Sequence, residues 1–149
     1  MTLKNGNSID GGKLLMKDQW NTELHGDLAD AYTEGITLIP AEVRFHKETH
    51  SGFWGSDTKF AEYLKREGTR TLLFAGVNTD QCVLATMLDA AQRGYDTIML
   101  KDACGTVSPA FAKDMVEFNA HKAFGFLSSC DDFLYEAQHV ETSHSKSEL

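Results

Sequence analysis

Cys82 is the residue of this 149-residue chain whose type and position are best suited to covalent chemistry. It follows an apolar run that ends in Ala-Gly-Val and the polar tetrad Asn-Thr-Asp-Gln, and it opens a segment with helical spacing. Backbone N–H groups in the first turn of a helix lack intrahelical partners, and the helix dipole there favours a thiolate. The same N–H groups could hold an oxyanion if the sulfur attacked an acyl carbon. By position alone, a small buried core thiol is an equally good interpretation of Cys82.

The other two cysteines, Cys104 and Cys130, also lie near the ends of predicted strands. Neither begins a well-marked helix with polar residues ahead of it, which favours a core or loop thiol for both. Three widely spaced cysteines do not match a disulfide framework, and free thiols are typical of a reducing compartment. We therefore predict a cytoplasmic protein.

Strands and helices alternate along the part of the chain that would position Cys82. A continuous apolar run predicts a buried strand at residues 69–77, another strand is expected at 96–104, and a last short strand at 122–129. Residues 36–47 should hold one or two short extended pieces, which Pro40 interrupts. The spacing predicts helices over residues 56–68, 79–94, 108–121 and 130–138, with Ser56, Thr79 or Asp80, and Ser108 as N-caps and Pro109 at the first position of the third.

This alternation is typical of βαβ units, in which right-handed crossovers place helices on both faces of a parallel sheet. We therefore predict an α/β fold. The length fits one domain over residues 1–149. Residues 1–12 and 140–149 are expected to be flexible, because the first are rich in Gly and Asn and the last are polar.

The net charge of −8 argues against a nucleic-acid surface, which needs clustered Lys and Arg, and against docking to an anionic membrane. No apolar run approaches the roughly 20 residues that span a bilayer. The sequence thus predicts neither a nucleic-acid nor a membrane partner.

The segment AGVNTDQCVLATMLDA around Cys82 resembles the signature of the isochorismatase-like cysteine hydrolases. Lys47 lies in FHKETHSGFWGSD, which is similar to the family's Lys and its following Ser-x-Phe-x-Gly-Thr turn, and WNTELHGDL is similar to its Trp-Gly-Thr-Glu segment. The resemblance extends roughly from Trp20 to Phe133. It implies a three-layer Rossmann-like sheet, and members of the family cleave amide C–N bonds or the vinyl ether of isochorismate.

The resemblance also implies roles for individual residues. Cys82 would be the nucleophile and Lys47 the cationic member of an Asp–Lys–Cys triad. A lysine beside a cysteine favours the thiolate, which makes this pairing physically reasonable. The family often has a cis peptide bond at the position of Val77–Asn78, which would direct the backbone N–H of Asn78, beside that of Cys82, at the oxyanion.

Substrate contacts are predicted for Phe53 and Trp54, in the turn after Lys47, and for Thr79 of the motif. Simple packing is the alternative for the two aromatic residues. His46 and His50 are four residues apart but do not form His-Glu-x-x-His. We therefore predict no metal site and no cofactor.

The family's aspartate, which ends its first strand, has no counterpart that we can identify. Alignment backwards from Cys82 predicts an N-terminally shortened chain that lacks the first two strands. Because an incomplete sheet exposes an edge that must be covered or paired, we expect a homo-oligomer, a dimer or larger. By residue type alone, the candidates for the missing base are Asp80, Glu48, Glu23 and Asp102.

Two functions are compatible with these observations. The first is a cysteine hydrolase acting on a small amide-like or isochorismate-type substrate. The alternative is a catalytically impaired, shortened member of the family that acts as a binding or assembly protein.

Overall fold

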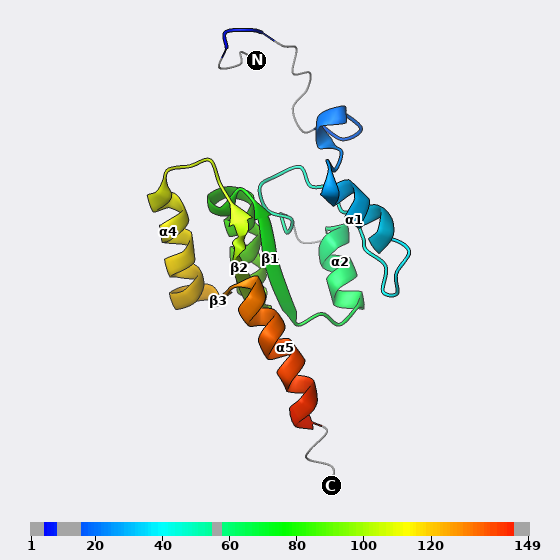
Figure 1. Ribbon diagram of the computed structural model, residues 1–149, viewed down its shortest axis with the longest axis vertical. Coiled ribbons are helices and arrows are strands. Elements are labelled where there is room, and N and C mark those ends of the chain that lie inside the picture. The colour runs from blue at the N-terminus through cyan, green and yellow to red at the C-terminus, as the bar shows by residue number, and fades with distance from the viewer. Residues whose placement is uncertain (1–4, 9–15, 55–57, 145–149) are drawn as a thin grey trace. The chain divides into compact units, whose positions relative to one another are not determined.

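The computed structural model describes residues 5–8, 16–54 and 58–144, and the chain divides into two compact units, Met1–His46 and Lys47–Leu149 (Figure 1). The prediction of one domain over residues 1–149 stays a prediction. So does the flexibility of its two ends, although a helix reaches as far as His144.

The first unit contains a short 3₁₀ helix, η1 (Trp20–Thr22), and helix α1 (Asp27–Gly35). Arg44 ties the unit together, because its guanidinium donates hydrogen bonds to Glu23 Oε2 at 3.2 Å and to the carbonyl of Thr22 at 2.7 Å.

The extended pieces expected within residues 36–47 are not found, and the structure has no strand there. The carbonyl of Gly35 instead accepts hydrogen bonds from the N–H groups of Leu38 and Glu42, which turns the chain back at the end of α1. Pro40 has no N–H to donate to a strand partner, and the Ile39–Pro40 peptide bond is cis.

The second unit alternates helices and strands as predicted. Each of its strands except the last is followed by a helix that returns the chain to the next strand, and a single π-helical turn precedes or extends two of the helices. The elements are α2 (Lys59–Arg66), β1 (Thr71–Val77), η2 (Thr79–Val83), α3 (Leu84–Gln92), β2 (Asp96–Gly105), α4 (Ala110–Asn119), η3 (Ala120–Phe124), β3 (Phe126–Ser128) and α5 (Cys130–His144).

Within the described residues, the sheet has three parallel strands in the order β1–β2–β3. The α/β prediction is therefore confirmed. Strand β1 is not buried as its continuous apolar sequence predicts, because Leu73 is 44% and Val77 71% exposed. In the described structure β1 pairs with β2 alone, so its other edge carries no neighbouring strand.

Two clusters of buried side chains hold the second unit together. One joins η2 and α3 to β2, α4 and η3, and the other joins the loop before α2 to α2 and α3. The first consists of Val83, Met87, Met99, Cys104, Val116 and Ala120, and the second of Phe53, Leu64 and Ala90.

The N-terminal caps of α2 and α4 differ from the predictions. Thr58 caps α2, since its Oγ1 accepts a hydrogen bond from the N–H of Ala61 at 3.1 Å, while the predicted cap Ser56 lies outside the described residues. Ser108 does not cap α4, because Pro109 occupies the N-cap position and the N–H of Ser108 donates to Thr106 Oγ1.

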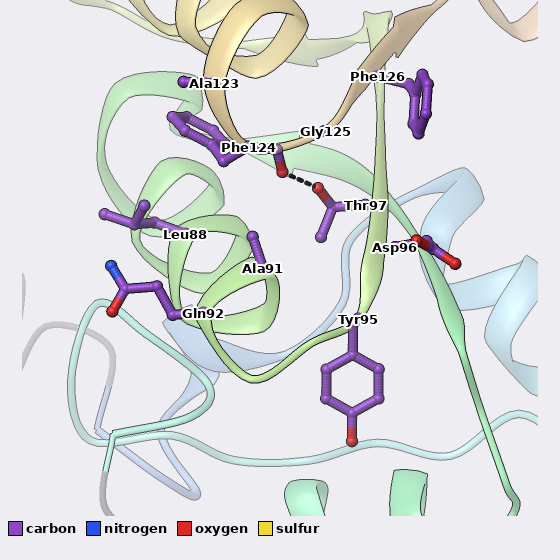
Figure 2. Close-up of a pocket in the computed structure, with 10 residues that line it drawn as sticks. All are labelled: Leu88, Ala91, Gln92, Tyr95, Asp96, Thr97, Ala123, Phe124, Gly125 and Phe126. Carbon is purple, nitrogen blue, oxygen red and sulfur yellow. Dashed lines mark hydrogen bonds between the residues drawn. The ribbon is translucent and has the colours of Figure 1, made fainter.

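The last strand is shorter than predicted. Residues 122–124 belong to the π-helical turn η3, and β3 begins only at Phe126. Gly125 lies between the two, directly against Thr97 of β2 (Figure 2). The close contact between this glycine and β2 fixes where the strand can start.

Candidate active site

Lys47 and Cys82 meet at the carboxyl end of β1. Cys82 lies in η2, the turn that follows the strand, and Lys47 Nζ is 3.5 Å from its Sγ although the two residues are 35 positions apart. The Lys47 ammonium also donates a 2.6 Å hydrogen bond to the carbonyl of Thr49. The cation that the sequence analysis paired with this cysteine is therefore in contact with it.

The turn that carries Cys82 is a π-helical turn around the carbonyl of Asn78, which accepts hydrogen bonds from the N–H groups of Gln81 and Val83. The Val77–Asn78 peptide bond is cis, as the resemblance implies. The roles of the Asn78 and Cys82 N–H groups as an oxyanion hole stay predictions.

Asp80 does not cap this turn with its side chain, contrary to our prediction, and neither does Thr79. The Asp80 carboxylate instead accepts a 2.5 Å hydrogen bond from the hydroxyl of Thr106, in the loop after β2. Hydrogen bonds from Thr106 and then from Ser108 hold the pKa of Asp80 below its ordinary value. The loop after β2 is thereby attached to the turn that holds Cys82.

The three predicted substrate contacts lie in different environments. Phe53 is 1% exposed and its ring packs against those of Phe60 and Tyr95, as the packing alternative describes, whereas Trp54 is 71% exposed. Thr79 is fully buried, and its Oγ1 has no hydrogen-bond partner among the residues that the structure describes. Their roles toward a substrate stay predictions.

The carboxylates considered as bases are engaged elsewhere or exposed. Asp102 accepts two hydrogen bonds from the N–H of Cys130, at 2.9 and 3.1 Å, and these lower its pKa. Glu23 pairs with Arg44 in the first unit, and Glu48 is exposed. In the described part of the second unit, no carboxylate forms a hydrogen bond with Cys82 Sγ.

The other cysteines differ from Cys82 in their surroundings. Burial raises the pKa of the Cys104 thiol, which is 6% exposed and donates to the carbonyl of Phe74. Desolvation, followed by the nearby Asp102 carboxylate, raises the pKa of the Cys130 thiol. All three cysteines are free thiols.

Thr86 was not among the site residues predicted from the sequence. Its hydroxyl donates to the carbonyl of Cys82 at 2.7 Å and accepts from the N–H of Gly52 at 3.2 Å, so it joins the turn after Lys47 to the helix that carries Cys82. The available signal was its position four residues after the cysteine, on the same side of a helix.

A pocket of about 600 Å³ lies near the amino ends of β2 and β3, away from the carboxyl end of β1 (Figure 2). Thr97 and Phe126 contribute to it from the starts of β2 and β3, whereas Cys82 follows the end of β1. None of the predicted site residues lines this pocket.

The described residues contain neither a metal-binding cluster nor a membrane-spanning helix. No group of three or more His, Cys, Asp or Glu side chains is arranged to hold a metal ion. Among the same residues, no helix has both the length and the apolar character that crossing a membrane requires.

Comparison with known proteins shows the family of this chain. A family model described as the isochorismatase domain matches residues 8–132. The chain belongs to the isochorismatase family. It is 35% identical to the ureidoacrylate amidohydrolase RutB of Caulobacter vibrioides over 122 residues, which cover 82% of this chain and 50% of the relative. The RutB of Klebsiella pneumoniae is 34% identical over 124 residues, covering 83% and 48%.

Solved structures share the fold. The nicotinamidase/pyrazinamidase PncA of Bacillus subtilis has a TM-score of 0.71 at 21% identity, covering 79% of this chain and 63% of that protein. The nicotinamidase SaPncA of Staphylococcus aureus has a TM-score of 0.69 at 22% identity, covering 78% and 70%. The chain spans about half the length of the curated relatives it matches.

Proposed function

We propose that this chain is a cysteine hydrolase that acts on a small amide-like C–N or isochorismate-type substrate. The observation that carries the proposal is the 3.5 Å approach of Lys47 Nζ to Cys82 Sγ at the carboxyl end of β1. Ligands and reactive groups of open α/β sheets lie at this edge. The similarity to enzymes named ureidoacrylate amidohydrolases favours an amide-like substrate.

In the reaction, the Cys82 thiolate adds to the carbonyl carbon, and the negative charge that develops on oxygen is held by the N–H groups of Asn78 and Cys82. The tetrahedral intermediate expels the amine and leaves a thioester on Cys82. Water then hydrolyses the thioester and releases the acid. The buried Thr79 hydroxyl has no hydrogen-bond partner among the described residues, which favours a polar contact in this site, since buried polar groups normally have partners.

Lys47 accounts for the protons in this scheme. Its ammonium stabilises the thiolate before the attack and supplies the proton that the departing amine needs. The neutral amine of Lys47 then takes a proton from the attacking water, which restores the starting state. The scheme needs no carboxylate at the sulfur, in agreement with the hydrogen bonds that occupy Asp80 and Asp102.

Mild iodoacetamide treatment near neutral pH is expected to label Cys82 selectively. The thiolate is the reactive form, and at Cys82 the Lys47 ammonium lies 3.5 Å from the sulfur, whereas the pKa values of the Cys104 and Cys130 thiols are raised. Mass spectrometry of peptides measures the three sites in one sample, so Cys104 and Cys130 serve as internal controls. Labelling of all three only at alkaline pH would count against the nucleophile.

The alternative is a catalytically impaired family member that binds or assembles without turnover. The engagement of Asp80 and Asp102 away from the sulfur favours it, if a carboxylate base is indispensable. Complete absence of turnover across a panel of small amides, with Cys82 reactive, would support this function over the first.

We also propose a cytoplasmic homo-oligomer, a dimer or larger. The exposed Leu73 and Val77 of β1 and the unpaired edge of this strand in the described structure favour association, and the three free thiols favour a reducing compartment. Light scattering at micromolar concentration should give a mass of at least two chains. A monomeric mass would exclude the oligomer.

A further inference from the structure

We propose that Thr86 is a positioning residue that sets the distance between the Lys47 ammonium and the Cys82 sulfur. The inference rests on the proposed function, since it gives Lys47 a role beside the thiolate. It extends that function to a residue whose hydroxyl bonds to the backbone of Cys82 and of Gly52.

The Thr86 hydroxyl forms two hydrogen bonds. It donates at 2.7 Å to the carbonyl of Cys82, one helical turn earlier, and accepts at 3.2 Å from the N–H of Gly52. A hydroxyl has one donor and two acceptor positions, so both bonds form together. Donation to the carbonyl four residues earlier is common for threonine in helices, but the bond from Gly52 links the helix to a distant loop.

Gly52 belongs to the loop that follows Lys47, and hydrogen bonds within this loop hold it. The Lys47 ammonium donates to the carbonyl of Thr49 at 2.6 Å, and the hydroxyl of Thr49 donates to the carbonyl of Ser51 at 2.9 Å. Ser51, 4% exposed, accepts at its Oγ from the N–H of Phe53 at 3.1 Å. The loop is therefore held in one conformation from the lysine side chain to Phe53.

This loop is attached to α3 and to the residue that follows α3. At its far end, the carbonyl of Phe53 accepts a 2.9 Å hydrogen bond from Arg93, just after α3, and the Arg93 guanidinium lies over the Phe53 ring. Near the start of α3, the attachment is the bond from Gly52 to Thr86. Arg93 fixes the loop far from the sulfur, whereas Thr86 fixes it one helical turn from Cys82.

Together the contacts close a ring. It runs from Cys82 Sγ to Lys47 Nζ, along the loop to Gly52, through the Thr86 hydroxyl and back to the carbonyl of Cys82. Loss of the Thr86 hydroxyl opens the ring on the side away from the reacting atoms and leaves a part-buried N–H of Gly52 without its partner. The Lys47 ammonium then loses its fixed position beside the sulfur.

The test uses iodoacetamide labelling of Cys82 across the neutral pH range, which requires no turnover. Thr86→Val keeps the shape of the side chain and removes the hydroxyl. It is expected to slow labelling near neutral pH about tenfold, the size of one weakened charge-assisted contact, and to move the pH profile upward. Thr86→Ser keeps the hydroxyl and is expected to label like the unmodified chain.

A double-mutant cycle with Lys47→Met separates positioning from a general structural effect. Lys47→Met alone should slow labelling, and Thr86→Val should add nothing to it. Thr33→Val is the matched control, because the Thr33 hydroxyl makes the same type of bond within α1, at 2.8 Å to the carbonyl of Ala29, and is not part of the ring. It should leave labelling unchanged.

Wild-type labelling rates in Thr86→Val would overturn the proposal, and so would equal slowing by Thr86→Val with and without Lys47. If Thr86→Val does not fold, Thr86→Ala removes the same hydroxyl with a good helix former and is expected to give the same cycle.

The outcome is independent of the hydrolase function. Coupling of Thr86 to Lys47 in a chain that hydrolyses no amide would leave the positioning role and remove the hydrolase. Hydrolysis that depends on Cys82, together with unchanged labelling of Cys82 in Thr86→Val, would exclude the positioning role and leave the hydrolase. Where turnover is found, Thr86→Val should lower kcat with little change in KM, because its expected effect is on the position of Lys47 and not on substrate binding.

Discussion

Replacement of Cys82 by alanine is expected to abolish amide hydrolysis, with a fall in kcat/KM of about 10⁴-fold or more, the size found when a covalent nucleophile is removed. No other thiol replaces it, because burial keeps Cys104 protonated and Cys130 lies beside the Asp102 carboxylate. Hydrolysis would be followed by release of amine or ammonia from a panel that includes ureidoacrylate and nicotinamide, the substrates in the names of similar proteins.

Cys130→Ala is the matched control, since it removes a partly exposed thiol that is not in contact with Lys47. It should retain activity. Turnover that survives Cys82→Ala would exclude the thiol mechanism altogether, whatever the substrate. Equal melting temperatures for the two variants would show that the comparison concerns chemistry and not folding.

Replacement of Gly125 by alanine is expected to reduce the free energy of unfolding by up to about 3 kcal/mol, as for other overpacked sites. The added Cβ would collide with Thr97 Oγ1 and lie 2.5 Å from the Thr97 carbonyl oxygen and 3.0 Å from Met87 Cε. The carbonyl is part of β2, and the hydroxyl is held by its 2.6 Å hydrogen bond to the carbonyl of Phe124, so neither can move away easily (Figure 2).

Chemical denaturation measures this loss, and Gly105→Ala is its control. A Cβ at Gly105 would meet only Val77 Cγ1, at an ordinary 3.6 Å, so its stability should change little. The backbone at Gly125 is extended, with φ of 169°, so any difference between the two variants comes from space and not from backbone conformation. Equal stability of both variants would contradict the packing described here.

The sequence predicts the pairing of Cys82 with Lys47 only through the family resemblance. Cys82 alone fits a nucleophile or a core thiol, and nothing in its neighbourhood specifies a cation 35 residues away. The motif spacing carries that information, and the structure brings the two atoms together. The linking role of Thr86 and the hydrogen bond that Thr106 donates to Asp80 were not predicted, because each depends on a contact between distant segments.

The helices and strands show the same contrast between features set by local sequence and features set by contacts elsewhere in the structure. Strands β1 and β2 are predicted because their apolar runs are local signals. The N-cap of α4 is mispredicted because Ser108 interacts with Thr106 and Asp80 in preference to the start of its own helix. Residues 122–124 were expected in the last strand, but they form a π-helical turn, since β3 starts only after Gly125 has packed against Thr97.

The hydrogen bond between Asp80 and Thr106 has a consequence for how such a protein can change its substrate. Loops after neighbouring strands are the usual place where new specificity is acquired, since they vary without disturbing the sheet. Here the loop after β2 is hydrogen-bonded to Asp80, two residues from Cys82 in the turn after β1. Diversification of that loop therefore also alters the orientation of the thiol, and libraries that vary Thr106 should vary Asp80 with it.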